Sequence, residues 1–394
     1  MPRELRPFLL ITTALVLAAL LLETSNDRFW LSDFRVYWSA ARALVDQQEV
    51  YGIAYGEDTG FFKYAPVVAL AFVPASFLPF ELAAVIHFML IGLALAMAMI
   101  RMEEQLMRHF FMAFAPRILL RAILVLLCIV VLLSRELHVG NINLWLVAGV
   151  VAATSALLSG NKTSAGILLG CMFLVKPYLA LMIIPLLVRR QWPVLLACGI
   201  SIAVGLALPF LLLGPARAWQ LHVDWVHAMA AHNNYLTSPN TFSAWIGRIW
   251  PCFPSWVVLG LVACALATTG LSKGGKGVFP PERSLCFELW TAFALVPNLV
   301  VTDQEHFLFS LPLIAYVIAN LFHRKNPLAT GFFLLAMCLF ATRSTDLWGS
   351  HIENQLAAYG ALGIGNLLLV ACCWLVSGRR LVERHSDGGR GQAR

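Results

Sequence analysis

The sequence predicts an all-α polytopic membrane protein with roughly 12 transmembrane helices. Of its 394 residues, 60% are hydrophobic and 12% are charged, roughly half the charged fraction of soluble domains. The hydrophobic residues form long runs, and the basic residues cluster in short segments between those runs. A water-soluble globular protein is therefore excluded.

The first apolar run, residues 7–22, predicts a helix that starts in the cytoplasm, because Arg3 and Arg6 precede it. Polar residues 23–27 follow, without the small-residue pattern of a cleavage site, so we interpret the run as a retained span. A cleaved signal peptide is the alternative. Taken in order, the apolar runs predict spans near residues 7–22, 81–100, 118–134, 143–159, 164–175, 178–188, 192–213, 255–271, 285–301, 306–322, 328–343 and 355–376.

Residues 65–79 are also apolar, but they are few for a crossing and contain Pro66, Pro74 and Pro79. If this segment stays on the outer surface, the basic clusters of nearly every inner loop fall in the cytoplasm. We therefore expect a juxtamembrane helix there, together with an amphipathic helix over residues 34–45. Both termini are then cytoplasmic.

Lys176 and Pro177 interrupt the apolar run from residue 165 to residue 188. A turn at the outer face keeps Lys162 and Arg189 on one side, so two short helices are expected to meet at Lys176. About 24 helical residues rise only about 36 Å in total, which is short for two crossings.

The predicted organisation is a single transmembrane domain over residues 1–380 and a disordered cytoplasmic tail over residues 381–394. Residues 23–80 form the first outer loop and residues 214–254 the second large one. The net charge of +7 comes from topology-setting clusters, so no nucleic-acid partner is expected. The nine cysteines lack paired spacing and indicate neither a disulfide framework nor a metal site.

In this topology most polar residues that could form a site lie on the outer face. Asp33 lies there beside the bilayer, although it could simply cap the helix that follows it. Lys176 needs an anion or an aqueous cavity, because a lysine inside an apolar hairpin costs a few kcal/mol. His306 follows Asp303 and Glu305 and also suits an anionic ligand.

Ordinary roles are open for the other polar residues. Arg35 and Lys63 could reach lipid headgroups, and residues 232–234 could form a solvated loop. The tryptophans of the second outer loop fit an interfacial belt. Residues 272–277 resemble a nucleotide loop only superficially and are interpreted as a cytoplasmic connector.

Five segments in order carry a family resemblance. Asp33, Phe34, Tyr37, Ala40 and Ala41 come first, followed by residues 50–51, 62–66, 140–143 and 174–178. Together they resemble glycosyltransferase family 87, most clearly over residues 28–190, with looser agreement at Asn233, Asn240 and His306. The chain departs from the family by Tyr64-Ala65-Pro66 in place of Tyr-Pro-Pro, and by Asn141 in place of glutamine.

The resemblance implies a GT-C fold and a polyprenyl-phosphate-mannose-dependent mannosyltransferase with Asp33 as catalytic base. The expected reaction is inverting transfer of a hexose, mannose by resemblance, from a polyprenyl-phosphate donor to a hydroxyl of a glycolipid or glycan acceptor. It is expected at the outer face of a bacterial inner membrane. The partners are the donor, the acceptor and membrane lipids; no cofactor is required, and a divalent metal is compatible with the chemistry.

The site residues follow from this hypothesis. Three cations are expected to hold the donor phosphate: Lys63, Lys176 and His306. Residues expected to contact the substrates are Arg35, Tyr37, Tyr64, Asn141, Asn143, His232, Asn233 and Asn240. A transporter or flippase for a lipid-linked sugar is the rival function, and a non-catalytic scaffold is a third. A transporter predicts paired halves related by an internal repeat, which the sequence does not show.

Overall fold

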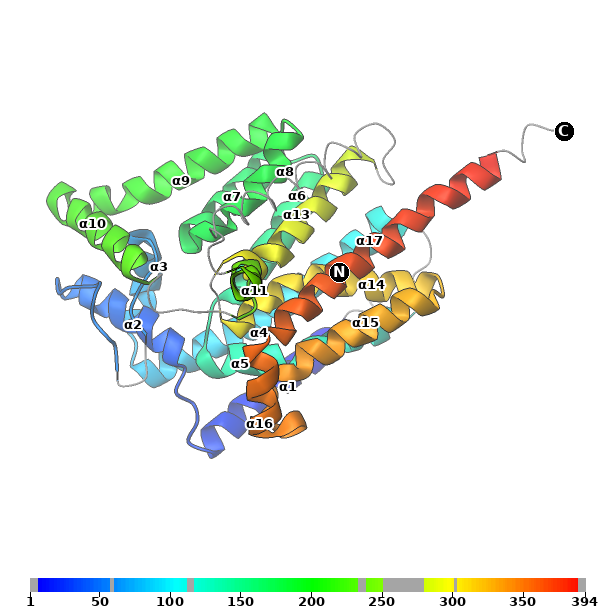
Figure 1. Cartoon of the computed structure of the whole chain (residues 1–394). Coiled ribbons are helices and arrows are strands. Elements are labelled where there is room, and N and C mark those ends of the chain that lie inside the picture. Colours follow the sequence, from blue (N-terminus) through cyan, green and yellow to red (C-terminus); the bar gives the residue numbers. More distant parts are fainter. Residues whose placement is uncertain are drawn as a thin grey trace. The chain divides into compact units, whose positions relative to one another are not determined.

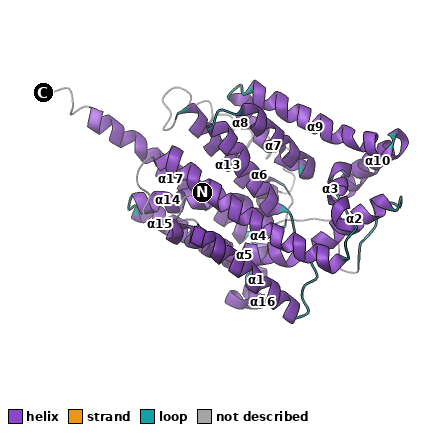
Figure 2. Cartoon of the chain, turned by 180° about the vertical axis from the view of Figure 1, so that it is seen from behind, coloured by secondary structure: helices purple, strands orange, loops and turns teal. Residues whose placement is uncertain are grey.

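The protein is all-α in the part of the chain that is described. A computed structural model describes residues 6–56, 60–111, 117–232, 239–250, 280–300 and 303–388. These residues form helices and turns, and their one β-type pairing is the isolated antiparallel bridge between Ala54 and Phe61. Figure 2 shows the helices in purple and no strand in this part of the chain. The predicted all-α class is therefore confirmed.

The helices identify a polytopic membrane protein. Five described helices are long and apolar enough to cross a bilayer: Phe8–Ser25, Phe80–Phe111, Ile118–Val139, Trp192–Leu213 and Gln304–His323. A sixth span is available if Pro327–Arg343 and Thr345–Ala358, which are bent by 87° at their junction, count as one. The other apolar helices are shorter. The predicted span over residues 255–271 lies outside the described residues, and the total of roughly 12 stays a prediction.

The described chain divides into two compact units. The first comprises Met1–Arg101, Leu133–Ala180 and Trp192–Thr237, and the second comprises Met102–Leu132, Leu181–Gln191 and Ser238–Arg394. The expected extents of the transmembrane domain, residues 1–380, and of its outer loops stay predictions. Helix α17 continues to Gly388, into the segment expected to be a tail.

The first unit holds the helices that carry most of the predicted site. They are α1 (Arg6–Ser25), α2 (Ser32–Val45), α3 (Pro66–Ser76), α4 (Phe80–Gln105), the end of α5 (Ile118–Val139), α6 (Asn143–Leu158), α7 (Lys162–Val175), α9 (Trp192–Leu213) and α10 (Pro215–His232). Helices α7 and α9 pack side by side, as both views show (Figures 1 and 2).

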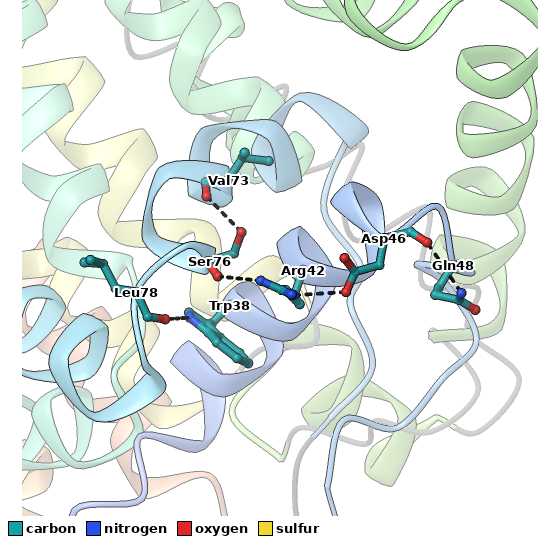
Figure 3. Close-up of polar contacts among 7 residues, drawn as sticks. All are labelled: Trp38, Arg42, Asp46, Gln48, Val73, Ser76 and Leu78. Carbon is teal, nitrogen blue, oxygen red and sulfur yellow. Dashed lines mark hydrogen bonds and ion pairs between the residues drawn. The ribbon is translucent and has the colours of Figure 1, made fainter.

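Helices α2 and α3 form in the places where juxtamembrane helices were expected, and polar contacts tie them together (Figure 3). The Trp38 indole N–H donates to the carbonyls of Ala75 and Leu78, at 3.1 and 3.3 Å. Arg42 reaches the carbonyl of Ser76 at 3.5 Å and is held by Asp46 at 2.9 Å. Because these contacts close off the carbonyls at the end of α3, they fix α2 against it.

The break at Lys176 is present. Helix α7 ends at Val175, Lys176 is extended, and a 3-10 segment over Pro177–Met182 leads into the short helix α8 (Ile183–Val188). The second leg is therefore less regular than expected, because Pro177 has no N–H with which to continue the α-helical bonding.

The second unit contains α11 (Phe242–Ile249), α13 (Pro281–Leu299), the 3-10 segment Gln304–Ser310, α14 (Leu311–His323), α15 (Pro327–Phe340), α16 (Thr345–Ala358) and α17 (Ala361–Gly388). The last expected span, residues 355–376, begins later than predicted. Gly360 ends α16 with a φ of +73°, and a Cβ there would lie 2.2 Å from the carbonyl of Pro239. Only glycine suits that turn, so the helix restarts at Ala361.

The second unit also buries ion pairs. Arg189 donates two hydrogen bonds to Glu288, at 2.7 and 2.6 Å, and Arg121 lies 2.6 Å from Glu103. Each of these arginines has a carboxylate partner, which is what a charge in an apolar surrounding requires.

Candidate active site

Asp33 lies in the first turn of α2 but is not its cap. The N-cap position is Leu31, which has left-handed backbone angles and no side-chain capping bond. The Asp33 carboxylate instead accepts a hydrogen bond from Asn141 Nδ2, at 2.6 Å. The alternative in which Asp33 serves as a helix cap is therefore wrong.

Asn141 connects Asp33 to two tyrosines. Its Oδ1 accepts from the Tyr37 hydroxyl at 3.2 Å and from the Ile142 N–H at 2.7 Å. The Tyr37 hydroxyl lies 2.9 Å from that of Tyr64, and the Tyr51 hydroxyl donates to the Tyr64 carbonyl at 2.8 Å. With donors on Oδ1 and a carboxylate on Nδ2, only one orientation of the Asn141 amide satisfies every partner.

Tyr37 stays a neutral hydrogen-bond donor. Burial raises the pKa of the Tyr37 hydroxyl well above its usual value, and the neighbouring Tyr64 and the charge of Asp33 raise it further. A phenolate beside the Asp33 carboxylate would place two negative charges in a desolvated pocket. The Tyr37 hydroxyl can therefore orient Asn141 without competing for the proton that a base at Asp33 would accept.

The loop that carries Asn141 is shaped by Gly140 and His87. Gly140 has a φ of +69°, and a Cβ there would lie 3.1 Å from side-chain atoms of Leu31 and Phe34. His87 Nε2 lies 3.0 Å from the Gly140 carbonyl, and the His87 ring stacks on Phe34 with centroids 4.3 Å apart. The loop therefore packs directly on the start of α2, which brings Asn141 to Asp33.

A second polar network is centred on Asn143, two residues after Asn141 and at the start of α6. Lys176 Nζ donates to Asn143 Oδ1 at 2.6 Å, and Asn143 Nδ2 donates to Glu136 Oε2 at 2.8 Å. Lys176 is 3% exposed, and Asn143 and Glu136 are fully buried. A lysine this buried requires a compensating negative charge nearby, and Glu136 supplies one.

Glu136 was missed as a site residue. The structure places it in the last turn of α5. Two features of the sequence could have identified it. Lys176 needs a counter-charge, and Glu136 is a carboxylate at the end of an apolar run.

An apolar cavity of about 730 Å³ opens in the first unit between α3, α4, α6 and α7. Its walls include Val68, Phe72, Ile86, Trp145, Cys171 and Met172. Three further lining residues are chain neighbours of the polar groups: Phe34 follows Asp33, Ile142 follows Asn141, and Val175 precedes Lys176. An apolar cavity next to a carboxylate and a lysine suits an amphipathic ligand with an anionic head.

Arg35 and Lys63 are placed near this site without joining the hydrogen bonds described above. The Arg35 guanidinium lies over the Phe80 ring, 4.0 Å from its centroid, and its expected headgroup or substrate contact stays a prediction. The Lys63 carbonyl accepts from the Trp225 indole N–H at 3.2 Å, which ties α10 to the segment before α3. Lys63 itself is half-buried.

The remaining predicted residues lie elsewhere. Asn233 and the side chain of His232 are outside the described residues. Asn240 and His306 belong to the second unit. There, Asn240 Oδ1 accepts from the Gly363 N–H at 3.1 Å, and Asn298 Nδ2 donates to the Asn240 carbonyl at 3.1 Å. These bonds give Asn240 a structural role, and its predicted substrate contact stays a prediction.

His306 lies in a buried 3-10 turn, with Nδ1 3.2 Å from the Asp303 carbonyl. Asp303, Glu305 and His306 each offer one ligand atom within 4.8 Å of the others. A histidine with two carboxylates is a set that a transition metal could bind. The expected phosphate contact of His306 stays a prediction.

Comparison with known families agrees with the resemblance seen in the sequence. The family model of glycosyltransferase family 87 matches residues 61–273, more than half of the chain. The match includes Lys63, Tyr64, Asn141, Asn143 and Lys176. Asp33 and His306 fall outside it. A search of curated proteins gives no match.

Proposed function

Because the chain belongs to glycosyltransferase family 87, and is thus a membrane glycosyltransferase, we propose that it transfers a hexose from a polyprenyl-phosphate donor with Asp33 as catalytic base. The observation that carries this proposal is that a carboxylate, Asp33, and a buried lysine, Lys176, are both hydrogen-bonded to one short segment, residues 141–143, beside a cavity of about 730 Å³. A nucleotide-sugar donor would have no use for such an apolar cavity, whereas a lipid-linked donor needs one.

The proposed reaction is a single displacement. The acceptor hydroxyl gives its proton to Asp33 while its oxygen attacks the anomeric carbon. The bond from that carbon to the phosphate oxygen breaks on the opposite face, so the configuration inverts. The electron pair leaves with the polyprenyl phosphate, and the Lys176 ammonium offsets its growing negative charge.

The donor sugar is proposed to be mannose, and the acceptor a hydroxyl of a glycolipid or glycan. These assignments rest on the family resemblance. Lys63 and His306 are proposed as further phosphate ligands, and Arg35, Tyr64, His232, Asn233 and Asn240 as substrate contacts. No metal is required in this scheme, because lysine supplies the positive charge, so transfer should persist in EDTA.

The proposed orientation places the site on the outer face of a bacterial inner membrane and both termini in the cytoplasm. The support is the clustering of Lys and Arg between apolar runs. The family resemblance adds the proposal of a GT-C bundle of roughly 12 helices, in which the helix break at Lys176 lies at the membrane surface.

The test is an assay in detergent with purified protein. Polyprenyl-phosphate-mannose is incubated with candidate glycolipid and glycan acceptors, and released polyprenyl phosphate and mannosylated acceptor are measured. The proposal expects both products in equal amounts, with an inverted linkage. A flippase would give neither, because detergent removes the compartments but leaves transfer chemistry intact.

A further inference from the structure

Glu136 accepts hydrogen bonds at both its backbone and its side chain from a single short segment, residues 140–144. Its backbone carbonyl accepts from the N–H groups of Gly140 and Asn141, at 3.0 and 3.3 Å. Its carboxylate accepts from Asn143 Nδ2 at 2.8 Å and from the Leu144 N–H at 3.2 Å. One residue at the end of α5 thus holds both ends of the loop that carries Asn141 and Asn143.

The chemistry of Glu136 and Lys176 fixes the orientation of the Asn143 amide between them. A carboxylate only accepts hydrogen bonds and an ammonium only donates them. Asn143 lies between the two, so its Nδ2 must face Glu136 and its Oδ1 must face Lys176. The Glu136 carboxylate therefore sets the orientation of the amide that holds the lysine.

We propose that Glu136 is a positioning residue, which acts through Asn143 to aim the Lys176 ammonium at the donor phosphate. This inference rests on the proposed function, since it needs Lys176 as a phosphate ligand. Glu136 is fully buried, and contact with substrate is not part of its role.

Glutamine at position 136 breaks this arrangement while nearly preserving the shape. Its one oxygen can accept from the Leu144 N–H or from Asn143, but not from both in the observed geometry. If Asn143 turns its oxygen toward the new amide, its own NH₂ group faces the Lys176 ammonium. In that arrangement Lys176 loses the Asn143 oxygen, so Glu136→Gln should weaken the binding of polyprenyl phosphate by about tenfold.

A double-mutant cycle separates positioning from a general structural role. The affinity for polyprenyl phosphate is measured in detergent for the wild type, Glu136→Gln, Lys176→Met and the double variant, alongside KM and kcat for transfer from polyprenyl-phosphate-mannose. If Glu136 acts through Lys176, Glu136→Gln adds little further loss once Lys176 is methionine. If the two losses of affinity multiply, or Glu136→Gln binds as the wild type does, the inference is overturned.

The matched control is Glu23→Gln. The Glu23 carboxylate of α1 lies 2.9 Å from Nδ1 of His138, a residue on the same turn of α5 as Glu136. Glu23 is about a quarter exposed, so Glu23→Gln should leave the affinity for polyprenyl phosphate unchanged. If Glu136→Gln does not fold, Asn143→Ala cuts the same connection without changing either charge and replaces it in the cycle. Absence of transfer by the wild type would refute the proposed function. The double-mutant cycle, measured as affinity for polyprenyl phosphate, would still decide whether Glu136 acts through Lys176.

Discussion

Asn141 Nδ2 lies 2.6 Å from Asp33 Oδ2, and the two residues come from segments 108 positions apart. Asn141 was expected to contact substrate. In the structure its amide holds the carboxylate of the proposed base, with Oδ1 fixed by Tyr37 and by the Ile142 N–H, and its substrate contact stays a prediction. This hydrogen bond fixes the position of the Asp33 carboxylate at the start of α2.

Replacing Asn141 by aspartate should shift the pH dependence of transfer. Two carboxylates this close cannot both ionise easily, so the pKa of the pair rises and the base becomes protonated at a higher pH. We expect the acid limb of kcat/KM to move upward by about one pH unit or more. The control is Asn161→Asp, which adds the same charge at the N-cap of α7, where aspartate is equally suited. An unchanged acid limb in Asn141→Asp would contradict the role assigned to the Asn141 amide.

Tyr37→Phe should lower kcat by about fivefold, because Asn141 loses one hydrogen bond worth about 1 kcal/mol. It should also change the response to alkali. Since the folded-state pKa of Tyr37 is raised, its stabilising contribution is present below about pH 10 and is lost as the pH rises toward the folded pKa. The melting temperature in detergent should therefore fall less steeply above about pH 10 in Tyr37→Phe than in the wild type. An equally steep fall in both proteins would contradict this.

Cys171→Trp should select against long donors. Cys171 lines the apolar cavity, and an indole there would fill part of its volume of about 730 Å³. We expect KM for a long-chain polyprenyl-phosphate sugar to rise by about tenfold or more, because the blocked cavity can no longer bury the polyprenyl tail. KM for a donor with one or two isoprene units should change less. The matched control is Cys338→Trp, at an exposed free cysteine of α15. If both donors respond equally to Cys171→Trp, the cavity does not hold the chain.

Much of the helix arrangement could be predicted from the apolar composition of the segments and from the residues that interrupt them. The apolar runs located α1, α4, α5, α6, α7 and α9 to within a few residues, except that α4 and α5 run some five residues longer, because length and hydropathy dominate in such helices. Lys176 and Pro177 predicted the break after α7, since proline has no backbone N–H to continue the helix and burial of a lysine is costly.

What could not be predicted depends on contacts between distant segments. The roles of Asn141 and Glu136 follow from a loop that packs on α2 and from the position of Lys176, and neither relation has a local pattern. Arg35 lies on the Phe80 ring, which is 45 positions away, and no local pattern pairs these two residues. The late start of the last helix likewise arises where Gly360 meets the carbonyl of Pro239.

The measurement closest to the central claim is transfer by Asp33→Asn, purified in detergent, with polyprenyl-phosphate-mannose and the acceptor that the wild type uses. Asp46→Asn, at the exposed far end of the same helix, is the control. We predict that Asp33→Asn lowers kcat by at least about a hundredfold, because a general base is lost, while donor affinity stays within about threefold of the wild type. Wild-type turnover by Asp33→Asn would show that Asp33 is not the base.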